Sequence, residues 1–311
     1  MPMPLIFLRF CACFVLAAVP ASSGVARAFA AETPACIELT RSIEQAKPDS
    51  DLRRNIALFN AAGKGCIPLA QKLLDAGASV EASNRFGTTA LGEAARVGRL
   101  AMVDFLLAHG AAINARNVSG ATPLFDAVDA DYIEVAERLL DKGANPNLTG
   151  RSELTPLAAA AYHGNDRIVA ALLAHHADPN ALDRTEKAPI LYAAAQGFVP
   201  VVRRLLDAGV DAKARYGNQL TALMWAAGYA DGADEAGAAR IAQLLLEHGA
   251  SIDAADNRGR TALMIAAETG HLRMVELLLA RGADRDLRDK SGKTAADLAA
   301  SEAVRARLAA K

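Results

Sequence analysis

The sequence predicts an all-α solenoid of stacked helix-turn-helix units joined by hairpin-like loops, and three observations predict it. A short Thr-x-Leu block returns about every 33 residues. Two apolar stretches of helical spacing fit between successive blocks, and a polar, Gly-containing loop closes each unit. A fixed period of this length indicates a small unit that buries its apolar face only by stacking on copies of itself. We therefore expect one elongated domain.

The repeated blocks set the register of the predicted units. They begin at Thr89, Thr122, Thr155, Ala188, Thr221, Thr261 and Thr294. Every interval is 33 residues except the 40 residues between Thr221 and Thr261, and counting back 33 from Thr89 gives an eighth block at Ile56. The units are expected to start near residues 53, 86, 119, 152, 185, 218, 258 and 291, which gives a repeat domain of seven to eight units over residues 53–311.

Residues 89–116 show how each element of a unit follows from the sequence. An Ala-rich apolar stretch follows Thr89, and a second stretch has Val103 and Leu106 at the spacing of one helix face. Gly110 then stands where a left-handed helix end needs no Cβ. The residues before the next block are polar and turn-forming. The unit therefore consists of a helix, a turn, a second helix and a loop.

The long interval contains a small, acidic and Gly-rich insert at residues 228–237. We expect it to form a flexible loop between the two helices of one unit. A second irregularity concerns the loop Gly two residues before the block. The middle units replace this Gly by Glu153, Glu186 and Gln219.

The unit resembles the ankyrin repeat, whose Thr-Pro-Leu-His-x-Ala-Ala and Leu-Leu-x-x-Gly-Ala motifs the chain matches over about residues 53–311. One departure is consistent, because no copy has the His that follows Leu in the family. The residues in its place are Phe59, Gly92, Phe125, Ala158, Leu191, Met224 and Met264. In the family this imidazole forms hydrogen bonds between units, so apolar packing is expected to stabilise the stack in its absence here.

The N-terminus differs in kind from the repeats. Residues 10–19 form an uninterrupted apolar run after Arg9, and Ala28-Phe29-Ala30 has the small-x-small pattern of a signal peptidase site. The run is shorter than the about 20 residues that a membrane span needs. We predict a signal peptide over residues 1–30 that is cleaved after Ala30, and a periplasmic or secreted protein of bacterial type. An uncleaved anchor is the alternative.

The charge and the cysteines of the chain that remains after cleavage lead to two further expectations. Loss of residues 1–30 leaves 32 Lys and Arg against 35 Asp and Glu, so we expect no nucleic-acid partner and no stable membrane insertion. Cys36 and Cys66 remain, an even number in an oxidising compartment, which predicts a disulfide; two free buried thiols are the alternative. Cys36 lies in residues 31–52, where we expect a helix that caps the first unit.

The chain offers no recognisable catalytic or metal-binding arrangement. It lacks a Gly-x-Ser-x-Gly motif and a Gly-rich phosphate loop. His175 and His176 are adjacent, but neighbouring residues point apart at a helix end, so a metal site is not expected. We predict a protein that is not an enzyme, with no catalytic residues, no metal and no cofactor.

The resemblance implies that a partner protein binds in the concave groove formed by the loop tips and the first helices. Mapped by register, the candidate residues are Glu93, Asp126, Tyr162, His163, Tyr192, Tyr216, Trp225, Tyr229 and Glu268. Aromatic residues are only 5% of the chain, yet five of them fall on this set, and such side chains dominate interface energies. We expect a monomeric, non-catalytic protein-binding module. Three alternatives remain: an accessory factor that holds a small molecule or metal in the aromatic groove, sequence drift in which each aromatic side chain packs on a neighbour, and a structural spacer with no specific partner.

The signal peptide can be tested directly. When the full chain is expressed in a bacterium, the protein in the periplasmic fraction is expected to begin at Ala31, because cleavage follows the small residue Ala30. Intact mass spectrometry of the purified protein measures this. Recovery of residues 1–30 intact in the cytosolic fraction would contradict it.

Overall fold

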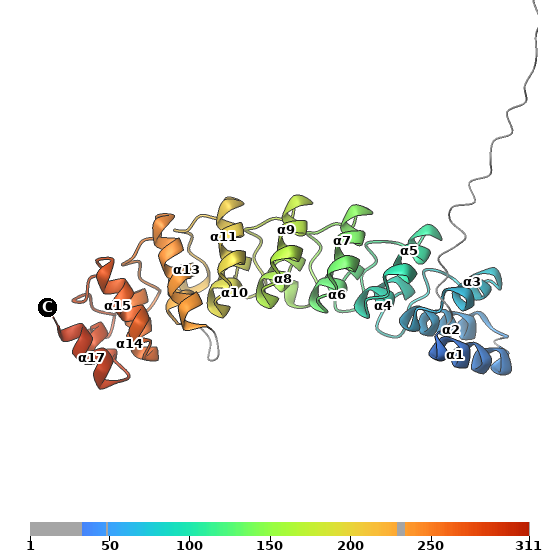
Figure 1. The fold of residues 1–311 in the computed structure, drawn as a ribbon, viewed down its shortest axis with the longest axis horizontal. Coiled ribbons are helices and arrows are strands. Elements are labelled where there is room, and N and C mark those ends of the chain that lie inside the picture. The colour runs from blue at the N-terminus through green and yellow to red at the C-terminus, as the bar shows by residue number, and fades with distance from the viewer. Residues whose placement is uncertain (1–32, 48, 229–233, 311) are drawn as a thin grey trace, which may run out of the picture.

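The computed structural model describes residues 33–47, 49–228 and 234–310, which form eight consecutive helix pairs preceded by one additional helix (Figure 1). The additional helix is α1 (Pro34–Ala46). The pairs are α2 (Asp51–Lys64) with α3 (Ile67–Asp75), α4 (Ala90–Arg96) with α5 (Leu100–Ala108), α6 (Pro123–Asp129) with α7 (Ile133–Asp141), α8 (Pro156–His163) with α9 (Asp166–Ala174), α10 (Pro189–Gln196) with α11 (Val199–Asp207), α12 (Ala222–Ala227) with α13 (Glu235–Glu247), α14 (Ala262–Thr269) with α15 (Leu272–Ala280), and α16 (Ala295–Leu298) with α17 (Glu302–Ala309).

The helices form two rows along an elongated, curved molecule (Figure 1). The first helices of successive pairs contact one another, as in the series α4, α6, α8, α10, α12 and α14, and the second helices from α5 to α15 form the other row. Figure 1 shows both ends of the molecule bending toward the side on which the first helices lie. These helices therefore line the concave, inner face, and the stack is the solenoid that the 33-residue period predicts.

The repeated threonines cap the first helices. In six units the Thr hydroxyl accepts a hydrogen bond from the backbone N–H three residues later, at 3.1–3.4 Å. Each bond satisfies one of the donors that a helix start leaves without a partner, and five of these threonines are buried away from water that could replace the bond. The fifth pair has Ala188 instead, and Pro189 follows it in the first helical turn, where its missing N–H leaves one donor fewer to satisfy.

The core between the units is aliphatic and tightly packed. Successive first helices meet through alanine pairs with no exposed surface, such as Ala160 and Ala161. The position that is His in the family is fully buried in the middle units, with Phe125 and Leu191 each 1% exposed. A Cβ added to Gly150 would lie 2.6 Å from the Phe125 ring, so this ring occupies the space that a larger residue at 150 would need. Apolar contacts therefore fill the space between units.

The loops between pairs are linked by backbone hydrogen bonds from one loop tip to the next. The Val118 N–H donates to the Phe86 carbonyl at 2.9 Å, and the Asn257 N–H donates to the Asn218 carbonyl at 2.9 Å. Corresponding backbone bonds join the later loop tips from Ser152 to Lys290, whereas the Arg116 side chain links its loop to Thr149 in the next one. Within the described residues the only isolated β-bridge pairs Ser83 with Thr89. The hairpin-like loops thus form a second, hydrogen-bonded edge to the stack.

Three middle loops adopt a left-handed backbone without glycine. Glu153, Glu186 and Gln219 have φ of 59°, 60° and 64°, close to the conformation of the glycines that hold this position in other units. For a residue with a Cβ this conformation costs about 1–2 kcal/mol. The strain is concentrated in consecutive units, beside the aromatic residues of the inner face.

The loop at the insert is shorter than the sequence indicates. α12 ends at Ala227 and α13 begins at Glu235, with the Asp234 carboxylate accepting the backbone N–H groups of Ala236 and Gly237 at 3.0 Å. The expectation of a loop over all of residues 228–237 was therefore wrong at its end, because Asp234 supplies a helix N-cap. Residues 229–233, and with them Tyr229, lie outside the described residues.

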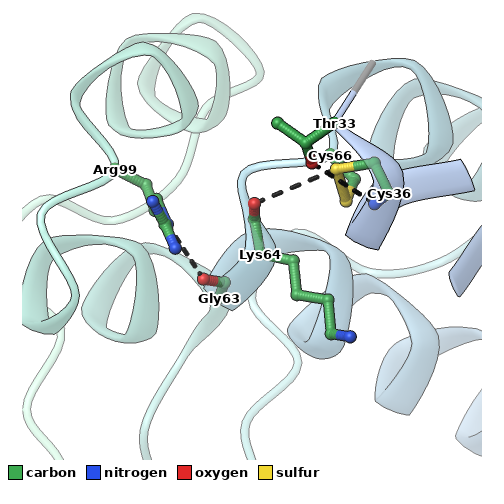
Figure 2. Close-up of a disulfide and its surroundings, with 6 residues drawn as sticks. All are labelled: Thr33, Cys36, Gly63, Lys64, Cys66 and Arg99. Atoms are coloured by element: carbon green, nitrogen blue, oxygen red, sulfur yellow. Dashed lines mark hydrogen bonds between the residues drawn. A yellow bond between two sulfur atoms is a disulfide. The ribbon is translucent and has the colours of Figure 1, made fainter. Parts of the chain in front are cut away.

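The N-terminal end is fastened by a disulfide between Cys36 and Cys66, whose Cα atoms are 5.4 Å apart (Figure 2). Cys36 lies in the first turn of α1 and Cys66 precedes α3, so the bond ties the extra helix to the turn between α2 and α3. α2 begins at Asp51, so the unit boundary expected near residue 53 falls inside it. Ile56 consequently lies within a helix and not at its start, because α1, and no hairpin, precedes this unit.

Removing the disulfide is expected to destabilise the N-terminal end. For Cys36→Ser/Cys66→Ser we expect the free energy of unfolding to fall by about 3–4 kcal/mol, since a loop of 30 residues is no longer closed in the unfolded chain. Urea unfolding followed by circular dichroism measures the change, with reduced wild type as the matched control. Two reactive thiols in denatured, unreduced mature protein would contradict the bond.

The strained loops give a second stability prediction. Each of Glu153→Gly, Glu186→Gly and Gln219→Gly is expected to raise the free energy of unfolding by about 0.5–1 kcal/mol, because glycine adopts a positive φ without steric cost but loses more backbone entropy. The control is Gly259→Ala, whose Cβ would lie 3.0 Å from the Lys290 nitrogen and should destabilise. Unchanged or lower stability in all three glycine variants would show that these loops are not strained.

Candidate inner-face binding site

Three aromatic side chains of the inner face come from successive first helices. Tyr162 lies near the end of α8, Tyr192 in α10 and Trp225 in α12. The Tyr162 and Tyr192 rings meet edge to face, with centroids 6.1 Å apart, an arrangement that their quadrupoles favour. Half of Tyr162 is exposed, whereas Tyr192 and Trp225 are partly buried against the core. The helical stack thus brings these three predicted residues into one line.

Lys187 joins the aromatic residues to the loop edge. It belongs to the loop before α10, and its ammonium group lies 5.7 Å from the centre of the Tyr192 ring and 5.1 Å from the centre of the Trp225 ring. Both contacts are within cation-π range. Lys187 was not among the predicted residues, although its place directly before a helix start is a signal that could have indicated it. We call Tyr162, Tyr192, Trp225 and Lys187 the aromatic cluster.

A buried carboxylate holds Tyr192 in place. The Tyr192 hydroxyl donates to Asp183 Oδ2, and Asp183 Oδ1 accepts the Thr185 and Lys187 backbone N–H groups at 2.7 and 3.1 Å. Burial alone would raise the pKa of Asp183, but the hydrogen bonds from Tyr192 and Thr185 outweigh it and lower that pKa. Burial, followed by the bond to Asp183, raises the pKa of Tyr192. Tyr192 is therefore a rigid, protonated donor.

Trp225 and Tyr216 each bury a polar atom without a partner. The Trp225 indole nitrogen and the Tyr216 hydroxyl are both inaccessible to solvent and make no hydrogen bond in the described part of the chain. An unpaired buried donor costs about 1–3 kcal/mol. Tyr216 lies in the hairpin loop where it was expected, with its ring packed against the core, and burial raises the pKa of its hydroxyl to about 12. It is therefore a supporting residue of this face.

An acidic group adjoins the aromatic cluster on the side of α4 and α6. The Asp129 carboxylate lies 2.6 Å from Nη2 of Arg151 and 3.7 Å from Nε2 of His163. The centre of the His163 ring is 5.4 Å from the centre of the Tyr162 ring. Glu93, on the preceding first helix, pairs with Arg96 at 2.8 Å. The inner face is thus continuous from charged residues at α4 to the aromatic cluster at α12.

Asp126 is the one carboxylate of this region with a strongly raised pKa. Burial is the largest cause, and the negative charges of Asp129 and Glu93 add to it, while Arg96 and Arg151 oppose it; the resulting pKa is about 6. The folded protein therefore binds the Asp126 proton more tightly than the unfolded chain does, although the carboxylate is mainly ionised at pH 7. Glu268, at the other end of the face, pairs instead with Arg260 and is not part of either group.

Neither a metal-ligand cluster nor a membrane-spanning helix is found among the described residues. Among them no set of three or more His, Cys, Asp or Glu side chains is arranged to hold a metal ion. No helix in the described ranges has the length and apolar character needed to cross a bilayer. The chemistry available on the inner face is that of aromatic stacking, hydrogen bonding and charge.

Comparison with protein-family models matches the chain to ankyrin repeats. A model of three copies matches residues 58–150 and 157–256, and a model of many copies matches residues 245–299. These ranges cover most of the chain, so the protein belongs to the ankyrin-repeat family. No curated protein matches it. Ankyrin repeats are generally protein–protein interaction modules, and proteins built from them are typically non-enzymatic scaffolds.

The raised pKa of Asp126 predicts a pH-dependent stability. Between its usual pKa of 3.8 and about 6 the folded state binds a proton that the unfolded chain releases, so Asp126 destabilises the fold as the pH rises through this window. Asp126→Asn should therefore be about 2–3 kcal/mol more stable than wild type at pH 7 and nearly equal at about pH 4. Urea unfolding of both proteins across this range tests it. A difference that does not change with pH would contradict it.

Proposed function

We propose that this ankyrin-repeat protein is an exported, non-catalytic module that binds another protein through the inner face of its middle units. The observation that carries the proposal is the aromatic cluster, three large rings presented by consecutive first helices with Lys187 over two of them. Large, rigid side chains of this kind bind partners at a low cost in side-chain entropy.

Preorganisation supports the same face. Tyr192 is fixed by Asp183, and Asp183 is fixed by its own loop, so the ring does not lose freedom when a partner binds. The adjoining loops at Glu153, Glu186 and Gln219 hold strained conformations that a purely structural loop would relieve with glycine. Backbone strain and side-chain rigidity therefore coincide with the partly exposed aromatic cluster.

Two features support export. The apolar run over residues 10–19, with its small residues up to Ala30, fits a signal peptide. The Cys36–Cys66 disulfide suits an oxidising compartment, since such bonds are rare where thiols are kept reduced. A periplasmic or extracellular partner follows from this proposal.

The binding face is tested by affinity capture. Tyr162→Ala and Trp225→Ala should each weaken retention of the partner at least about tenfold, because each removes an aromatic contact of about 1.4 kcal/mol or more. Tyr162 makes no hydrogen bond in the described structure, so its replacement should leave the melting temperature nearly unchanged. Mature protein is immobilised, periplasmic extract is applied, and the captured partner is then titrated against each variant by biolayer interferometry.

The matched control is Tyr132→Ala. Tyr132 is also partly exposed, at 39%, but it packs on Gly98 at the turn before α7 and not on the inner face. Its loss should leave partner affinity within about twofold of wild type. If Tyr132→Ala weakens binding as much as Trp225→Ala, or if neither inner-face variant weakens it, the proposed face is wrong.

A further inference from the structure

The loop tips carry a charge pattern that the aromatic cluster does not explain. Each of the seven repeated blocks is preceded by six loop residues, and these loops lie along one hydrogen-bonded edge. We call them together the hairpin row, residues 83–88, 116–121, 149–154, 182–187, 215–220, 255–260 and 288–293. The row contains eleven Lys and Arg but five Asp and Glu, a net charge of +6 in a chain whose formal net charge is −1. Opposite charges are thus segregated, since the rest of the chain carries −7.

Most acidic side chains of the row accept hydrogen bonds that stabilise their own loops. Asp183, Asp256 and Asp289 are buried and accept hydrogen bonds from backbone N–H groups of their own loops, such as Arg258 N–H to Asp256 at 2.8 Å and Ser291 N–H to Asp289 at 2.9 Å. Only Glu153 and Glu186 are exposed. The basic side chains are exposed in every loop of the row; these are Arg85, Arg116, Arg151, Arg184, Arg215, Arg258, Arg288, Lys290 and Lys293.

Several of these arginines are oriented without being neutralised. Arg116 donates to the Thr149 carbonyl at 3.0 Å, and Arg215 donates to the Ala255 carbonyl at 2.8 Å, in each case reaching the next loop. A carbonyl fixes a guanidinium but leaves its positive charge in place. Arg184 and Lys290 form no side-chain hydrogen bond or ion pair among the described residues. Arg151, Arg258 and Arg260 pair with acidic side chains, but the other basic residues of the row form no ion pair among the described residues.

We propose that the hairpin row binds an acidic segment, rich in Asp and Glu, of the partner protein. Clusters of basic residues recognise acidic motifs in this way, and oppositely charged surfaces accelerate and orient association. Lys187 belongs both to the row and to the aromatic cluster, so one segment lies on the row while an adjoining part of the partner contacts the rings. The inference rests on the proposed function and names the chemistry of the partner.

Charge also favours a polypeptide over a larger polyanion. DNA or an anionic bilayer brings a broad negative surface, which the −7 carried outside the row repels. An extended acidic segment is narrow enough to follow a single edge of the stack. The hairpin row is thus suited to a partner whose negative charge is confined to one short segment.

The test uses defined probes. Labelled peptides of about 20 residues with alternating Glu-Gly, Gln-Gly or Lys-Gly sequence are titrated with the mature protein by fluorescence polarisation, at about 50 mM and about 500 mM salt. We expect binding of the Glu peptide alone, and at least about tenfold weaker binding at the higher salt, because screening reduces interactions between exposed charges. Anionic phospholipid vesicles and a duplex DNA are measured in parallel.

Two matched double variants locate the interaction. Arg184→Glu/Lys290→Glu reverses two charges of the row and should weaken binding of the Glu peptide at least about tenfold at low salt. Arg203→Glu/Arg273→Glu makes the same change in net charge on α11 and α15, in the outer row of helices, and should change it less than about twofold. Melting temperatures of both variants verify that each is folded.

The outcomes separate this inference from the proposed function. Equal weakening by the two variants, or equal binding of the Glu and Gln peptides, would overturn the acidic-segment proposal. Tighter binding of vesicles or DNA than of the Glu peptide would overturn it in favour of that class. If the captured partner is lost with Trp225→Ala but retained by Arg184→Glu/Lys290→Glu, the inner-face function stands and the charge inference fails.

Discussion

The whole structure depends on apolar surface that each helix pair can bury only against its neighbours. Alanine pairs such as Ala160–Ala161 let the first helices approach closely, and the buried Thr caps close the helix starts at the same contacts. The family's bridging His is replaced by buried apolar residues such as Leu191 and Phe125. Units are joined instead by backbone hydrogen bonds between loop tips and by side-chain bonds between second helices, such as Arg204 to Asp166. Packing in the centre and backbone bonds at the edge together fix the inner face on which any partner must lie.

Much of the fold could be predicted because its causes are local and repeated. In most units the Thr that opens the block is an N-cap and the Gly that closes the second helix has a positive φ, so both signals act within a few residues. The irregular parts of the fold were harder to predict from the sequence. Asp234 starts a helix within the insert, and α1 replaces a hairpin before α2, and in both places the 33-residue register gives no information.

The site was predicted less completely than the fold, for a physical reason. Register places Tyr162, Tyr192 and Trp225 on one face, but it does not show which loop side chains fold over them. Lys187 and Asp183 contact the rings from the loop. The Tyr216 hydroxyl is buried although Arg215 and Asn218 of the same loop are exposed. Such contacts depend on the path of the loop backbone, including the left-handed turn at Glu186, which no periodic pattern encodes.

The two ends of the stack differ in a way that gives the molecule a direction. The first pair is clamped to α1 by a covalent bond, whereas the last pair begins with α16, a helix of only four residues. In a chain of nearest-neighbour contacts, fraying begins where the terminal contact is weakest. The last pair is held by non-covalent contacts alone, mainly with α14 and α15, so a reductant would loosen one end of the stack and leave the other unchanged.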